Sequence, residues 1–295
     1  MSFLLYWLGV VMAILSGVTN NFGTVLQKKV VNEFKDSSKF FRSLIKNRLW
    51  LIGLIFQLAI GAVLFLIAQM FIGPTLIPGL MAAGLIVLAI GSVKIANEQL
   101  KMLEIIGIIL MIIAITFIGF SSMEIDVGSL NFFEFGLIFR IMIFTIIIYI
   151  LAAICYILQL KNVSKGISLA VYSGFQFALS NFWISPIMGV LVHVFDGTAQ
   201  LLEIIIFILA ILILISTNIF GTSSIQKAFR EGQASNLIPI QQVPIQIAPP
   251  FYYIAVFLLP IQDALSLFFL IIGIVLVIIS SFLLGKRQAQ IEKIK

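Results

Sequence analysis

The stretch NLIPIQQVPIQIAPPFYY, Asn236 to Tyr253, places four prolines and three glutamines in a run long enough to cross a bilayer. Because proline lacks a backbone N–H and its ring clashes with the preceding turn, these prolines are predicted to break or bend a helix. They are Pro239, Pro244, Pro249 and Pro250. In hydrocarbon, freed carbonyls and glutamine amides need partners in protein or in a water-lined cavity. The stretch therefore predicts either a solute site at membrane depth or a kinked helix that packs through its amides.

The rest of the chain has the composition of an all-α integral membrane protein. Of its 295 residues 61% are hydrophobic and 10% charged, and the mean hydropathy is +1.19. A span needs about 20 mostly apolar residues. Nine spans are predicted, at 3–26, 49–70, 74–95, 102–120, 135–159, 167–192, 202–222, 235–258 and 264–285. The lipid bilayer is the expected partner. The net charge of +6 is spread over loops, so it predicts no nucleic-acid partner.

Basic residues orient these spans. The longest loop, 27–48, carries seven lysines and arginines, so the positive-inside rule makes it cytoplasmic and leaves the N-terminus outside. Alternating from there puts 17 of the 18 basic residues inside, Arg140 being the exception. The outer loops carry Glu124, Asp126, Asp196 and Asp263. We expect a plasma-membrane protein whose C-terminus, a basic tail at 286–295, is cytoplasmic.

An internal repeat divides the chain. TLIP, ending at Pro78, matches NLIP, ending at Pro239, so Pro78 is a further helix-breaking candidate; SGVTNNFGTVLQKK at Ser16 likewise pairs with SGFQFALSNFWISP at Ser173. Residues 1–120 thus form a first four-span repeat, 121–165 hold an outer loop and the linking fifth span, and 166–285 form the second repeat. Because one span intervenes, the repeats are inverted, as in alternating-access carriers. A homodimer is compatible with this organisation.

Polar side chains inside the spans form the candidate substrate-binding set. Any one of them is explained by interhelical hydrogen bonding, worth roughly 1 kcal/mol in membrane bundles. Together they predict a polar cavity, and Gln242, Gln246 and Tyr253 share one helical face. The set is Asn20, Asn21, Gln57, Gln176, Asn181, Asn218, Gln241, Gln242, Gln246 and Tyr253.

Acidic residues avoid the middle of every predicted span, which disfavours proton coupling through a buried carboxylate. Glu98 and Asp263, at span ends, are candidates for gating or ion entry; the alternative for Glu98 is that it complements the dipole of the next helix. No GxxxxGK[ST] loop, catalytic constellation or metal-ligand cluster is present. The sequence therefore predicts neither an ATP-driven pump nor an enzyme, and it implies no cofactor.

The segment AQMFIGPTLIPGLMAAGLIVLAIGSVKIANEQLKMLEIIGIIL, from Ala68, resembles the drug/metabolite transporter superfamily in its proline helix, acidic loop and glycine-bearing last helix. Within it, the closest likeness is to the NIPA-like magnesium transporter family. The features are VLQKK before a long basic loop, LIPGLMA, ANEQL and nine spans with the N-terminus outside. This resemblance covers nearly the whole chain and implies a nine-span Mg²⁺ transporter.

Two substrates stay open for a secondary carrier or facilitator that works by alternating access. Mg²⁺ prefers octahedral oxygen ligands, keeps several waters and usually takes one or two carboxylates. The predicted midplane offers amides instead, which can hold a hydrated ion or a small polar organic metabolite or drug. An organic cation could also stack over Tyr252, Tyr253 or Trp183. A non-transport scaffold is a third alternative, because fold alone does not fix function.

Overall fold

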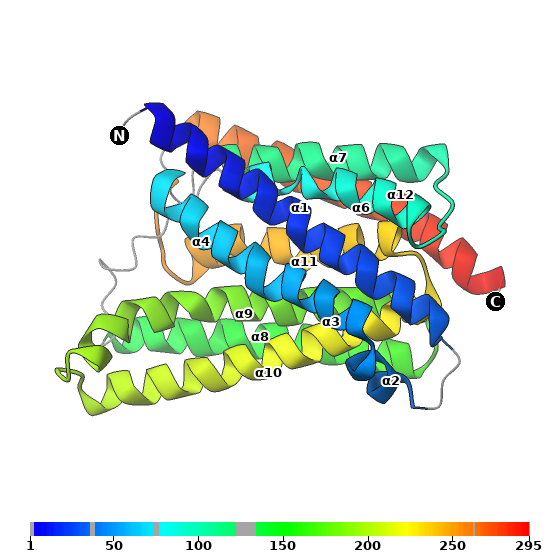
Figure 1. The fold of residues 1–295 in the computed structure, drawn as a ribbon. Helices are drawn as coiled ribbons and strands as arrows, with labels where there is room; N and C mark the ends of the chain where they lie inside the picture. Colours follow the sequence, from blue (N-terminus) through cyan, green and yellow to red (C-terminus); the bar gives the residue numbers. More distant parts are fainter. Residues whose placement is uncertain (1–2, 36–38, 73–76, 122–133, 262, 295) are drawn as a thin grey trace.

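The computed structural model describes residues 3–35, 39–72, 77–121, 134–261 and 263–294, and all regular structure in these ranges is helical (Figure 1). The predicted all-α class is confirmed. In chain order the helices are α1 (Phe3–Glu33), α2 (Phe40–Lys46), α3 (Arg48–Ile55), the π-helix η1 (Phe56–Ile60), α4 (Gly61–Ile72), α5 (Ile77–Met81), α6 (Gly84–Lys94), α7 (Met102–Phe120), α8 (Phe135–Leu160), α9 (Lys165–Phe195), α10 (Leu201–Glu231), α11 (Ala234–Ala255) and α12 (Ala264–Ile294).

Seven segments in the described ranges are long and apolar enough to cross a membrane: Leu4–Glu33, Arg48–Ile72, Met102–Phe120, Phe135–Leu160, Lys165–Phe195, Leu201–Glu231 and Ala264–Lys293. The protein is therefore an all-helical membrane protein with seven candidate spans. The other two predicted spans coincide with helices that are shorter or more polar. The described part of segment 74–95 contains α5 and α6, and segment 235–258 contains most of α11.

Of the two predicted effects of the prolines, a break in the helix does not occur in α11. Helix α11 continues through all four of its prolines, so none of them breaks it. Each proline removes only its own N–H and frees one carbonyl, and neighbouring helices can satisfy a freed carbonyl at membrane depth. Pro239, Pro244 and Pro250 are buried. The interruption lies instead in the first half, where α5, which contains Pro78, ends at Met81 and α6 begins at Gly84.

Helix α11 lies at the centre of the bundle. Figure 1 shows it between a layer that contains α1, α4, α6, α7 and α12 and a layer of α8, α9 and α10. It contacts α9, α12, α7 and α6. A polar, proline-rich helix can be accommodated there because protein surrounds most of it.

Two sets of contacts recur in different parts of the bundle. Ser16 Oγ on α1 donates to Gly61 O on α4 at 2.8 Å, and Ser173 Oγ on α9 donates to Gly221 O on α10 at 2.7 Å. Helices α7 and α12 pack antiparallel through glycines. A Cβ at Gly107 would lie 2.7 Å from Leu284, and one at Gly273 would lie 2.6 Å from Ile118. Leu284 follows Gly273 by 11 residues, as Ile118 follows Gly107, so this interface is symmetric in sequence.

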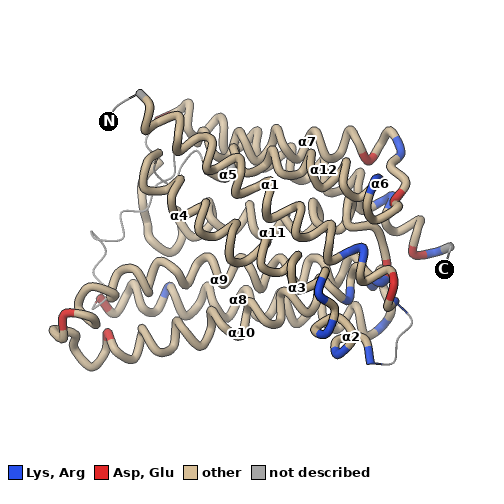
Figure 2. The backbone as a smooth tube through the Cα atoms, viewed as in Figure 1, with Lys and Arg blue, Asp and Glu red and all other residues tan. Residues whose placement is uncertain are grey.

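Lysine and arginine positions gather at the end of the bundle that carries α2 and the C-terminus (Figure 2). We call this the basic end. It comprises α2, the last turn of α10 and the first turn of α9, with the loop that joins α6 to α7. Arg140, the exception in sequence, donates its Nε to Val256 O at 2.7 Å.

Candidate functional site

A polar stripe on α9 forms the centre of the candidate site. Ser173, Gln176 and Ser180 recur at helical spacing and are all buried. Ser173 Oγ accepts a hydrogen bond from Gln241 Nε2 of α11 at 2.7 Å, and Ser180 Oγ accepts one from Asn218 Nδ2 of α10 at 2.7 Å. The stripe therefore joins three helices through side-chain hydrogen bonds.

Gln176 lies between these two connections and differs from its neighbours. It is 3% exposed, and its Oε1 has no hydrogen-bond partner within the described residues. A Cβ added at Gly221 would lie 3.4 Å from Gln176 Cβ, so this residue is next to the contact between Ser173 and α10. A buried amide oxygen without a partner costs about 1–3 kcal/mol. A ligand or a bound water that donates to Gln176 Oε1 would offset this cost.

The first half carries a second polar group between α1, η1 and α4. Asn20 and Asn21 are partly buried, and Asn21 Nδ2 donates to Gly17 O at 3.0 Å. Gln57 belongs to the π-helix η1, a type of irregularity that often marks functional sites. Its Oε1 accepts from Gln27 Nε2 at 2.9 Å.

The remaining candidate substrate-binding residues lie in different environments. Gln246 Nε2 donates to Gln242 Oε1 at 3.2 Å, and both side chains are only partly buried on α11. Tyr253 OH donates to Pro260 O at 3.1 Å, which explains that residue as a structural contact. Asn181 is exposed on α9 and is not joined to the stripe. The aromatic alternatives are packed: Trp183 donates its Nε1 to Thr145, and Tyr252 lies against Phe182 with ring centroids 5.1 Å apart.

Sequence reasoning missed a chain of buried amides that connects the two halves. Trp50 Nε1 donates to Gln226 Oε1 at 3.2 Å, Gln226 Nε2 donates to Gln27 Oε1, and Gln27 in turn donates to Gln57. Gln27 and Gln226 are each 1% exposed. Both precede a lysine at the end of an apolar run, a shared pattern that could have identified them.

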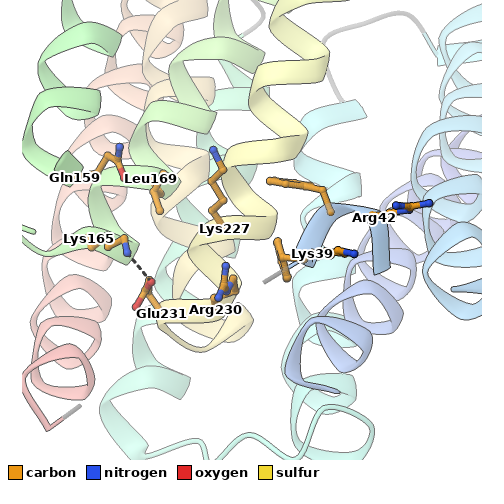
Figure 3. A pocket seen from close by; sticks show the side chains of 10 residues that line it. Lys39, Arg42, Gln159, Lys165, Leu169, Lys227, Arg230 and Glu231 are labelled. Carbon is orange, nitrogen blue, oxygen red and sulfur yellow. Dashed lines mark ion pairs between the residues drawn. The ribbon is translucent and has the colours of Figure 1, made fainter. Parts of the chain in front are cut away.

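A cavity of about 620 Å³ opens at the basic end (Figure 3). Its described lining is Lys39, Phe40, Phe41, Arg42, Gln159, Lys165, Leu169, Lys227, Arg230 and Glu231. Five basic side chains against one carboxylate repel a metal cation. The charge of this cavity therefore disfavours it as a site for Mg²⁺.

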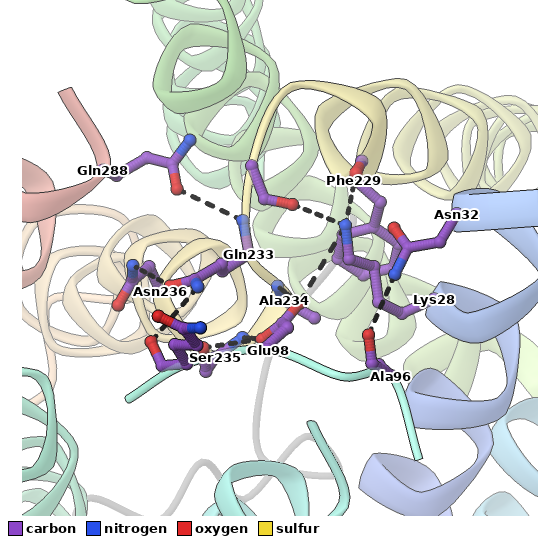
Figure 4. A network of polar contacts seen from close by, with 12 residues as sticks. Lys28, Asn32, Ala96, Glu98, Phe229, Gln233, Ala234, Ser235, Asn236 and Gln288 are labelled. Atoms are coloured by element: carbon purple, nitrogen blue, oxygen red, sulfur yellow. Dashed lines mark hydrogen bonds and ion pairs between the residues drawn. The ribbon is translucent and has the colours of Figure 1, made fainter. Parts of the chain in front are cut away.

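A buried polar network joins the N-terminus of α11 to neighbouring elements at the basic end (Figure 4). Glu98, between α6 and α7, is 7% exposed. Its Oε1 accepts from Ala234 N at 2.5 Å, and its Oε2 accepts from Ser235 N at 3.1 Å and from Ser235 Oγ at 2.7 Å. Glu98 therefore caps the N-terminus of α11, where the orphan N–H groups and the helix dipole favour an anion.

Cations and a second carboxylate complete this network. Lys28 Nζ donates to Phe229 O and Gly232 O, each at 2.5 Å, and lies 3.9 Å from Glu98 Oε1. Glu104, fully buried at the start of α7, accepts from Asn236 Nδ2 at 2.7 Å and lies 3.6 Å from Arg287 Nε. The hydrogen bonds that join α1 and the α6–α7 loop to α10 and α11 thus cluster at the basic end.

Asp263, the other gating candidate, has a different environment. It is exposed before α12, and its Oδ1 accepts from Ser266 N at 2.6 Å. This backbone hydrogen bond holds the pKa of the Asp263 carboxyl below its usual range. Asp263 therefore has the geometry of an N-cap of α12. This structural role accounts for the residue without a bound ion.

Acidic side chains in the described ranges do not cluster into a metal-binding site. No group of three or more His, Cys, Asp or Glu residues that could hold a metal occurs among the residues searched. Neutral amide oxygens, those of the α9–α11 group among them, are polar groups that the described spans do contain. Neutral oxygens suit a cation that keeps its water shell, because they accept hydrogen bonds from the waters.

Comparison with known proteins gives one match. The model of a family described as magnesium transporter NIPA matches residues 5–290 of the chain. No curated protein and no solved structure matches it.

Proposed function

The chain belongs to the magnesium transporter NIPA family and is a membrane magnesium transporter, and from this membership we propose how its residues carry the ion. The substrate site is the amide group between α9, α10 and α11, together with Gln242 and Gln246 on α11. Mg²⁺ binds there with its water shell, and amide oxygens accept hydrogen bonds from the bound waters. One observation carries this proposal: Gln176 Oε1 is buried and has no partner within the described residues.

Alternating access between two inverted repeats moves the ion. The recurring contacts support this part of the proposal, because the Ser16–Gly61 bond between α1 and α4 has its counterpart in the Ser173–Gly221 bond between α9 and α10. The reciprocal Gly107–Leu284 and Gly273–Ile118 contacts fit a two-fold relation between α7 and α12. In such carriers the site lies at the interface of the repeats near the membrane midplane.

Glu98 acts as a gate. With the N-terminus outside, as the basic residues favour, the basic end is cytoplasmic. The Glu98 cap on α11 and the Lys28 bonds to α10 then hold the cytoplasmic side closed. Release of the ion to that side requires these contacts to separate. Asp263, which caps its own helix, is not needed for this step.

Flux through reconstituted protein tests the site. Wild-type protein in liposomes is expected to show saturable Mg²⁺ entry reported by a trapped dye. The double variant Gln242→Leu/Gln246→Leu is expected to fall to the level of empty liposomes. Gln290→Leu, at an exposed position of α12, serves as the matched control and should keep the wild-type rate. Full activity in the double variant would refute the site assignment.

A further inference from the structure

The cavity at the basic end is lined mainly by basic side chains, which have no role in the proposed binding of Mg²⁺. Basic side chains enter it from three elements: Lys39 and Arg42 before and on α2, Lys165 on α9, and Lys227 and Arg230 on α10. Glu231 is the only carboxylate in its described lining. Five positive charges less one negative leave a formal charge of +4 around about 620 Å³. So dense a positive field attracts anions.

Cation–π contacts position two of these basic side chains. Lys227 Nζ lies 5.6 Å from the ring centroid of Phe41, and the Arg230 guanidinium lies 4.6 Å from that of Phe40. Both aromatic rings belong to α2, so cation–π contacts fasten α2 to α10 across the cavity. Figure 3 shows the Lys227 and Arg230 side chains between the α9 side and the α2 side of the cavity. Packing against α2 thus positions two of the five basic groups.

The one carboxylate of the described lining forms an exposed ion pair. Glu231 Oε1 lies 3.1 Å from Lys165 Nζ, in an ion pair whose lysine side chain is 42% exposed. An ion pair that exposed is worth about 0–1 kcal/mol, so an anion of higher charge can compete for Lys165. Arginine and lysine together are the usual phosphate-binding side chains, and arginine binds such groups in a bidentate manner.

We propose that this cavity is a binding site for a phosphate-bearing anion with two or more negative charges. Such a group occurs on anionic lipid headgroups and on soluble phosphates. Both have access to a site at a bundle end where α2 also exposes Phe41 and Ile45. A bound anion bridges α2 to α9 and α10 and so stabilises the basic end.

Binding to the purified full-length protein tests this site separately from transport. One arm titrates inorganic pyrophosphate by calorimetry at low salt; the other uses nanodiscs of zwitterionic lipid with and without phosphatidic acid, with thermal unfolding as readout. Wild-type protein is expected to bind at least one probe saturably. Lys165→Gln/Lys227→Gln, which lowers the formal cavity charge from +4 to +2, should weaken that binding about tenfold or more.

The control is Lys94→Gln/Lys286→Gln, which removes two exposed lysines outside the cavity lining. It should bind like the wild type. Response to pyrophosphate identifies a soluble phosphate as a sufficient ligand, and response to phosphatidic acid alone identifies the lipid headgroup. If the double variant does not fold, the exposed Arg42→Gln replaces it. Absence of saturable binding to either probe, or equal weakening in the control, overturns the proposal.

Discussion

Glu98 and Ser235, 137 residues apart in the chain, are joined by two hydrogen bonds to one carboxylate oxygen, from the Ser235 N–H at 3.1 Å and from its hydroxyl at 2.7 Å. This contact ties the α6–α7 loop to the first turn of α11. Because α11 carries the proposed substrate amides, the proposed mechanism uses this contact as a gate that separates during transport.

Replacing Glu98 tests this gate. Glu98→Gln keeps the size of the side chain but turns an N–H donor toward the N–H groups of Ala234 and Ser235. We expect it to lower the free energy of unfolding by about 1–3 kcal/mol, the usual cost of losing buried hydrogen bonds to a charged group. Thermal unfolding in detergent measures the loss. Labelling of Asn236→Cys from the cytoplasmic side should rise in this variant; unchanged labelling and unchanged stability would contradict the gate.

Lys28 acts mainly through carbonyl oxygens rather than through Glu98. Its Nζ lies 2.5 Å from Phe229 O and Gly232 O but 3.9 Å from Glu98 Oε1. Lys28→Met should therefore destabilise the protein even in a Glu98→Gln background. A double-mutant cycle should give a coupling energy under about 1 kcal/mol. A coupling of several kcal/mol would mean that the ion pair dominates.

Gln176 and Gln241 allow ligand and structural roles to be distinguished. Gln241→Leu breaks the bond to Ser173 and should lower the melting temperature. Gln176→Leu removes an unpartnered oxygen at similar volume, so stability should stay the same or rise by about 1 kcal/mol, while Mg²⁺ flux falls. If Gln176→Leu lowers stability and leaves flux intact, Gln176 is structural.

Gly17 tests the packing of α1 against α5. An added Cβ would meet the backbone of Met81, which cannot move without shifting a helix. Gly17→Ala is expected to cost about 1–3 kcal/mol through overpacking. Gly285→Ala is the matched control, because no atom lies within 4 Å of its added Cβ. It should be neutral or stabilise the helix by about 0.5–1 kcal/mol.

Asp263 predicts a pH dependence of stability. The pKa of the Asp263 carboxyl is depressed in the folded protein. Its contribution to the free energy of unfolding is therefore fully present above the ordinary pKa of about 4, and it is lost as the pH falls through the pKa of the folded state. The difference in melting temperature between the wild type and Asp263→Ala should narrow between about pH 5 and pH 3. A difference that is constant over that range contradicts a charged cap.

Local rules explain what the sequence could and could not predict. Helices and their membrane-spanning length follow from apolar runs, so the all-α class and most segment positions were predictable. Local proline rules do not predict that α11 continues without a break, because the buried environment around Pro244 is a property of the whole bundle. One alternative for Glu98 is that it complements the dipole of the next helix. In the structure Glu104 caps that helix through Lys101 N, and Glu98 caps α11.

The candidate site could also be predicted only in part from the sequence. The amides of α9, α10 and α11 were identifiable by type, since polar groups are rare at membrane depth. Their partners were not, because the hydrogen bond between Ser173 and Gln241 spans 68 residues. Asn181 shares its type with Asn218 but faces outward, and only the rotation of α9 in the bundle decides that difference.

Mg²⁺ protection of a single cysteine at position 246 tests the central claim most directly. The measurement uses Gln246→Cys in a Cys155→Ala background, reconstituted and labelled with a membrane-impermeant maleimide. We predict labelling from the side opposite the basic end, slowed several-fold by Mg²⁺ but not by K⁺ at equal ionic strength. Labelling at the same rate with and without Mg²⁺, or only from the basic end, would contradict an ion site among the α11 amides.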